Sequence, residues 1–210
     1  SGSSLKAEIN SNPYLISNNL LFRQHLNKVC CGKTLSFDVI LSLKLVLMHP
    51  NEQLITDFYL AFKNHDPQGM TACYAKNIIF EDPAFGKIQG KRAFAMWYML
   101  IERGGDALQI DFSEVQANDY NGSAKWTATY TYGPQKRKVV NHVVGTFSFQ
   151  NGKIVQHTDH FDLWRWSQQA LGFKGYLLGW TKFMKLKIQQ NTSKALSSYL
   201  HKMKSFDVAF

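Results

Sequence analysis

Two short segments contain the residue types best suited to chemistry. In the first, Phe80-Glu81-Asp82-Pro83, Asp82 alternates with Phe80, so both side chains should face inward from a short strand. A carboxyl group among aromatic rings loses hydration, which raises its pKa and makes it a usable general acid or base near neutral pH. The alternative is that Asp82 only caps the turn before Pro83.

The second segment is His157-Thr158-Asp159-His160-Phe161, in which His157, Asp159 and Phe161 share one face of a strand. An Asp and a His side by side can divide acid and base roles, because each changes the proton affinity of the other. The alternative is a hydrogen-bonded pair on a solvated sheet edge. We predict Asp82, Asp159 and His157 as the catalytic candidates.

The sequence indicates no metal and no nucleotide cofactor. His160 should point away from the face that holds His157 and Asp159, and no HExxH-like helix supplies further ligands. Phosphate-binding loops and dinucleotide fingerprints are also missing from the sequence. Cys73 lies in the apolar pattern of a helix, and no G-x-S-x-G elbow is present, so nucleophilic catalysis has little support.

Helical periodicity marks the elements before residue 105. Apolar residues recur at helical spacing from Leu54 to Phe62, and His65-Asp66-Pro67 should end that helix. A short second helix should carry Met70, Cys73 and Tyr74, and a strand should follow at 78–81. A third helix is expected over 91–103, where Gly104-Gly105 would end it.

From residue 108 to 161 the apolar period becomes two, which predicts three long strands in an antiparallel meander. Gly133-Pro134 and Asn151-Gly152 mark the turns, and Asn-Gly is typical of a tight hairpin. This order predicts an α+β fold in which a cone-shaped, curved antiparallel sheet wraps the N-terminal helices around a pocket. The predicted pocket residues are aromatic: Phe58, Tyr59, Phe62, Phe80, Trp97, Trp126, Tyr130 and Phe161.

The chain divides into three expected parts: a poorly ordered or accessory segment at 1–47, the cone domain at 48–162, and a basic amphipathic helical extension at 163–210. The hydrophobic content of 45% excludes a disordered chain. Three cysteines in no disulfide or metal-binding pattern favour the cytoplasm.

The net charge of +9 lies mostly in the extension, because residues 163–206 hold Arg165 and seven lysines but no acidic residue. We favour a lid over the pocket or a homodimer contact for this extension. Contact with a membrane surface is the alternative reading. No nucleic-acid-binding motif accompanies the charge, so specific nucleic-acid binding is not expected.

The order of these elements and motifs resembles the SnoaL-like branch of the nuclear transport factor 2-like superfamily over about residues 50–180. The segments that carry the resemblance are Phe62-Lys63-Asn64-His65-Asp66, Cys73-Tyr74-Ala75, Phe80-Glu81-Asp82-Pro83, Asn151-Gly152-Lys153-Ile154 and Asp159-His160-Phe161-Asp162.

The resemblance places Asp82 where ketosteroid isomerases keep their proton-shuttling aspartate. Their oxyanion-hole tyrosine would fall at Phe58 and their second aspartate near Gly145. Asp159 falls at the water-activating aspartate of limonene epoxide hydrolases, whose arginine and second aspartate would fall at Trp126 and Ala128 and whose asparagine would fall at Asp82. The resemblance therefore implies that the chain keeps one catalytic aspartate of each enzyme and has other residue types where their partner residues would be.

We predict a protein that binds a small apolar organic ligand, without metal or cofactor, as a homodimer. If it is catalytic, Asp82 and Asp159 would perform isomerase, cyclase or hydrolase-like acid–base chemistry with help from His157. The alternative is a noncatalytic domain that sequesters a hydrophobic ligand.

Overall fold

The structure is a computed structural model and describes residues 48–204. The predicted segment 1–47 and the last six residues of the extension lie outside the described residues. The described helices are α4 (Pro50–Lys63), α5 (Pro67–Ala72), α6 (Lys91–Gly104), α7 (Leu163–Leu171), α8 (Phe173–Leu178) and α9 (Lys182–Lys204), with a short 3₁₀ helix at Gly105–Ala107. The strands are β1 (Tyr74–Asp82), β2 (Gly86–Gln89), β3 (Gln109–Ala117), β4 (Asn121–Tyr132), β5 (Arg137–Gln150) and β6 (Lys153–His160).

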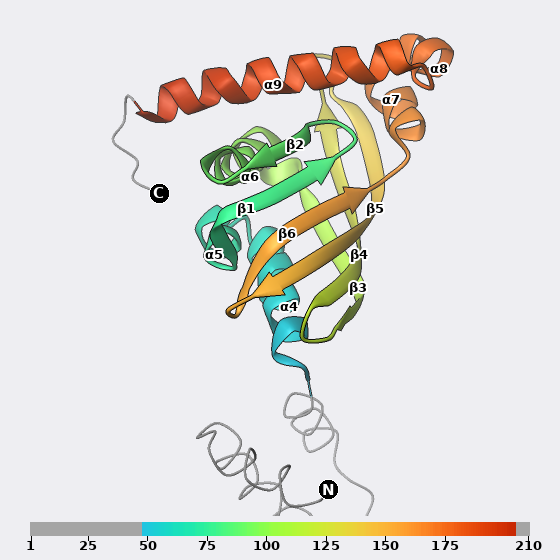
Figure 1. Cartoon of the computed structure of the whole chain (residues 1–210). Coiled ribbons are helices and arrows are strands. Elements are labelled where there is room, and N and C mark those ends of the chain that lie inside the picture. Colours follow the sequence, from blue (N-terminus) through green and yellow to red (C-terminus); the bar gives the residue numbers. More distant parts are fainter. Residues whose placement is uncertain (1–47, 205–210) are drawn as a thin grey trace, which may run out of the picture. The chain divides into compact units, whose positions relative to one another are not determined.

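The six strands form one curved, open sheet in the order β2-β1-β6-β5-β4-β3. Its strands β3 to β6 pair antiparallel as a meander, which confirms the prediction for that half. β1 pairs parallel to β6, so the sheet is mixed and not purely antiparallel. The sheet curves around α4, α5 and α6, as Figure 1 shows, and the predicted α+β architecture is confirmed.

Three details of the predicted elements were wrong. Four strands, not three, occupy the period-two region, because Asn118 turns the chain between β3 and β4 by accepting the backbone N–H groups of Tyr120 and Asn121. β1 begins at Tyr74 and not at residue 78, since Tyr74 pairs with Ile154 across the sheet. β2 was not expected, because its four residues carry too short a pattern to be recognised.

The Asn151-Gly152 hairpin agrees with the prediction. Both residues have positive φ, 52° and 69°, as the mirror-image turn between β5 and β6 requires. The pairing of β5 with β6 shifts register once between Ser148 and Phe149, and beyond this irregularity Gly145 lies opposite Asp159 and Phe147 opposite His157. The hairpin and this irregularity together determine what faces each candidate catalytic residue.

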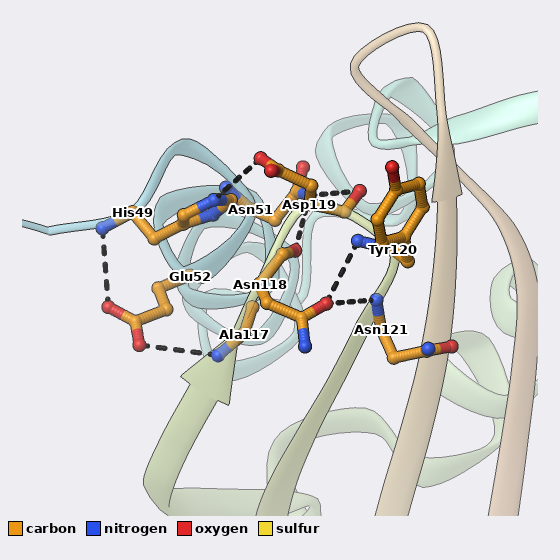
Figure 2. A network of polar contacts seen from close by, with 8 residues as sticks. All are labelled: His49, Asn51, Glu52, Ala117, Asn118, Asp119, Tyr120 and Asn121. Atoms are coloured by element: carbon orange, nitrogen blue, oxygen red, sulfur yellow. Dashed lines mark hydrogen bonds and ion pairs between the residues drawn. The ribbon is translucent and has the colours of Figure 1, made fainter. Parts of the chain in front are cut away.

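The N-terminal end of α4 is attached to the turn between β3 and β4 (Figure 2). The buried Asn51 side chain donates to the carbonyl oxygens of Asn118 (2.9 Å) and Asp119 (3.2 Å). Glu52 accepts from the backbone N–H groups of His49 and Ala117, which completes a capping box. These hydrogen bonds anchor the helix whose apolar face packs against the sheet.

One continuous core lies between the helices and the sheet. From α4 it receives Ile55, Phe58, Tyr59 and Phe62, and from α6 it receives Trp97 among others. Phe58 packs edge-on to Trp97, with their ring centroids 5.5 Å apart. Aromatic pairs in this arrangement stabilise the core beyond the effect of buried area alone.

Residues 163–204 form α7, α8 and α9, and α9 extends along one end of the sheet and past α6 (Figure 1). Two side chains of α9 bond the turn after β1: Gln189 donates to the carbonyl of Pro83 (3.2 Å) and Thr192 to that of Ala84 (2.8 Å). None of the helices within residues 48–204 has the length and apolar character needed to cross a bilayer.

Candidate functional site

A cavity of about 590 Å³ opens inside this fold, and its wall includes both Asp82 and Asp159. Most of its lining is apolar. Six of the eight predicted pocket residues line it: Phe62, Phe80, Trp97, Trp126, Tyr130 and Phe161. The other two, Phe58 and Tyr59, are fully buried behind the wall and are not part of it.

Asp159 is held in place on β6, a central strand. Its Oδ1 atom accepts from the Trp126 indole N–H at 3.0 Å and from His157 Nε2 at 3.0 Å. Only 3% of the residue is exposed. No donor among the described residues binds the second carboxyl oxygen, Oδ2, so this oxygen is available to a molecule in the cavity.

A chain of donors lies behind Asp159 and sets the tautomer of His157. The indole N–H of Trp97 donates to the Tyr74 hydroxyl (3.1 Å), which lies 2.6 Å from His157 Nδ1. An ionised carboxylate can only accept, so His157 Nε2 carries the proton that is donated to Asp159 Oδ1. When the ring is neutral, its Nδ1 atom is then an acceptor and the Tyr74 hydroxyl donates to it.

Tyr74 remains a donor because burial, with the charge of Asp159 as the next cause, raises the pKa of its hydroxyl well above the usual value. Sequence reasoning missed this residue by placing it on a helix. No local pattern in the sequence reveals the role of Tyr74, because it depends on the parallel pairing of β1 with β6.

His157 does not reach the cavity. It is fully buried, and its ring lies 4.3 Å from that of Phe147 and 5.3 Å from that of Phe80, measured between centroids. The alternative of a solvated edge pair is therefore wrong, because β6 lies between β1 and β5. His157 acts on Asp159 as a positioning residue and does not contact a cavity ligand directly.

Asp82 ends β1, where it caps a turn and also lines the cavity. Its Oδ1 atom accepts the backbone N–H groups of Ala84 and Phe85, so it caps the turn after Pro83, and its side chain also lines the cavity. Burial raises the pKa of Asp82 to about 7; the Phe85 N–H opposes this rise, and the negative charge of Asp159 adds to it. Asp82 therefore exchanges a proton near neutral pH.

The lack of a side chain at Gly145 makes space for Tyr59. A Cβ atom at this position would lie 2.6 Å from the Tyr59 hydroxyl oxygen and 3.2 Å from Asp159 Oδ1. The Tyr59 hydroxyl is buried with no hydrogen-bond partner, and burial raises its pKa well above the usual value. The position near which isomerases would place a second aspartate is thus occupied by the side chain of a neighbouring helix.

Several cavity residues were not expected from the sequence. Helix α9 supplies one side of the wall with Met184, Lys187, Ile188, Asn191, Thr192 and Ala195. Arg103 of α6, Asn141 of β5 and Trp166 of α7 add groups that can hydrogen-bond. The Trp166 indole donates to the Tyr130 hydroxyl at 2.7 Å. The spacing of Met184, Ile188 and Ala195 on one helix face was the available signal for the α9 contribution.

The mixed six-stranded sheet curved around the helices is a nuclear transport factor 2-like fold. Residues 55–157 match the family described as a SnoaL-like domain, which confirms the predicted resemblance. No curated protein is significantly similar to the chain.

Solved structures with this architecture include Bal32a from a soil-derived mobile gene cassette. It is 20% identical, covers 57% of this chain and 95% of its own, and has a TM-score of 0.51, which shows the fold. An LEH-like epoxide hydrolase from M. tuberculosis is 23% identical, with 62% and 91% covered and a TM-score of 0.45. A provisionally described polyketide cyclase from Pseudomonas putida KT2440 is 19% identical, with 59% and 98% covered and a TM-score of 0.49.

Proposed function

We propose that this protein binds a small apolar organic molecule in the cavity and catalyses proton transfer on it with Asp159 as base and Asp82 as acid. The observation that carries the proposal is that the two carboxyl groups end on one apolar cavity in different environments. Asp159 accepts hydrogen bonds from two N–H donors, and Asp82 has a pKa of about 7. Unequal environments of this kind divide acid and base roles between two carboxyl groups.

The chemistry follows from these environments. Oδ2 of Asp159 takes a proton from a carbon of the substrate or from a water molecule next to it. Protonated Asp82 gives its proton to the oxygen on which negative charge develops. The His157 N–H stays on Asp159 through the reaction and keeps the carboxylate oriented. Isomerisation, cyclisation and addition of water all use this pair of steps.

The apolar wall determines the substrate class. Phe80, Trp97, Trp126 and Phe161 offer flat hydrophobic surfaces, while the hydrogen-bond donors of the wall include Arg103, Asn141, Lys187, Asn191 and Thr192. A cavity of about 590 Å³ is within the usual range for small organic ligands. A mainly hydrocarbon molecule with one or two oxygen atoms fits this lining.

The test begins with mass spectrometry of whatever copurifies with the full chain, which identifies the ligand or its product. Turnover is then measured for Asp82→Asn and Asp159→Asn, with exposed Asp106→Asn as the matched control. We expect each cavity variant to lose about 100-fold or more in turnover while it still binds the ligand. Loss of affinity with no turnover in any variant, including the wild type, supports the noncatalytic binding domain instead. Unchanged turnover in both cavity variants refutes the proposal.

A further inference from the structure

Helix α8, the short segment after it and the first turns of α9 expose many large apolar side chains. Phe173 is 74% exposed, Trp180 70% and Phe183 69%. Four more apolar residues of this region are also exposed: Tyr176, Leu177, Leu178 and Leu186. We call these seven residues, with the lysines described below, the aromatic–lysine surface. Exposed apolar residues grouped in this way mark a contact site.

The backbone beneath this surface is packed firmly. Gly175 and Gly179 are buried on the side of α8 that faces α7, and a Cβ atom at either position would overlap Ser167. The Trp164 indole donates to the carbonyl of Tyr176 at 3.1 Å, which joins α7 to α8 a second time. Since α8 is fixed on its glycine side, its aromatic side faces outward as part of the fold.

The charges around the apolar residues all have one sign. Lys174, Lys182, Lys185 and Lys187 are exposed in this stretch, and residues 163–206 contain no Asp or Glu. A surface that combines lysines with exposed Trp, Phe and Tyr has the composition of segments that lie at the membrane interface. The positive charge of these lysines is complementary to an anionic surface.

We propose that the aromatic–lysine surface docks on an anionic lipid bilayer. Trp180, Phe183 and Phe173 would sit at the level of the headgroups, and the lysines would contact the lipid phosphates. A second copy of the chain fits less well, because a twofold contact would place this lysine-rich surface against itself. Protein interfaces are also depleted of lysine, and this surface has four.

Docking would place the cavity wall beside the membrane. Met184 and Ile188 line the cavity, whereas Phe183 and Leu186, on the same turns of α9, belong to the docking surface, and Lys187 belongs to both. Passage of an apolar ligand between bilayer and cavity rests on the proposed function, but the docking itself does not. Vesicle binding and turnover can therefore succeed or fail independently.

The experiment is vesicle flotation of the full chain with phosphatidylcholine alone and with phosphatidylcholine mixed with phosphatidylglycerol. We expect binding to the mixed vesicles only, and a loss of about tenfold or more in binding for Trp180→Ser/Phe183→Ser and for Lys182→Glu/Lys185→Glu. The matched controls, Tyr120→Ser and Lys76→Glu/Lys87→Glu, change an exposed aromatic and the same net charge elsewhere and should bind normally. Lipids brominated in their acyl chains should quench a tryptophan signal that Trp180→Phe lacks.

All of these substitutions are at exposed positions, so thermal unfolding should confirm that each variant keeps its fold. Absence of binding to the mixed vesicles overturns the proposal, as does binding that neither α9 variant weakens. Sedimentation equilibrium tests whether a second copy of the chain covers this surface instead. If the wild type is a dimer that Trp180→Ser/Phe183→Ser dissociates, and no vesicle binding is seen, the surface is a dimer contact and the proposal is overturned.

Discussion

Replacement of Asp82 by Asn should make the protein more stable above neutral pH, although it removes a residue of the proposed site. The ordinary pKa of an aspartate is 3.8, and in the folded protein burial raises that of Asp82 to about 7. Between these two values the folded state holds a proton that the unfolded state has lost. The free energy of unfolding of the wild type therefore falls as pH rises from about 4 to about 7, and the loss is complete above that range.

The magnitude follows from the same interval, which spans roughly three pH units. At about 1.4 kcal/mol per unit, the ionised Asp82 destabilises the fold by about 4 kcal/mol. Asn keeps the oxygen that accepts from Ala84 and Phe85 and cannot ionise, so it retains the turn without the penalty.

Urea unfolding of wild type, Asp82→Asn and the exposed control Asp106→Asn at several values from pH 4 to pH 8 measures this effect. We expect Asp82→Asn to match the wild type near pH 4 and to exceed it by roughly 4 kcal/mol at pH 8, while Asp106→Asn follows the wild type throughout. If Asp82→Asn and the wild type lose stability in parallel over the whole range, the assignment of a raised pKa to Asp82 is wrong.

Two further predictions concern the packing around the site and its support. Gly145→Ala should destabilise the fold by about 1–3 kcal/mol, because its methyl group would lie 2.6 Å from the Tyr59 hydroxyl oxygen. In thermal unfolding, the same change made together with Tyr59→Phe should cost much less, and strict additivity would contradict this account. Asn51→Ala should cost about 1–2 kcal/mol in urea unfolding, because it removes two hydrogen bonds to the carbonyls of the β3–β4 turn. An unchanged midpoint would show that this turn does not depend on Asn51.

The sequence alone determined the elements whose signals are local. The apolar stripe from Ile55 to Phe62 defined a helix, and Asn151-Gly152 defined a hairpin, because side-chain periodicity and turn geometry depend on neighbouring residues only. The same periodicity predicted that His157 and Asp159 share one face of a strand, and the structure shows that this face is buried.

Only the tertiary structure decided which of these residues meet across the fold. The parallel pairing of β1 with β6 brings Tyr74 to His157, 83 positions apart in sequence, and so converts a predicted acid–base participant into a positioning residue behind Asp159. The cavity likewise takes one side from α9, which follows the sheet in the chain and returns across its end. Contacts between distant segments depend on strand order and helix packing, which no local pattern encodes. The residue types for chemistry could therefore be read from the sequence, but their division into acid, base and support could not.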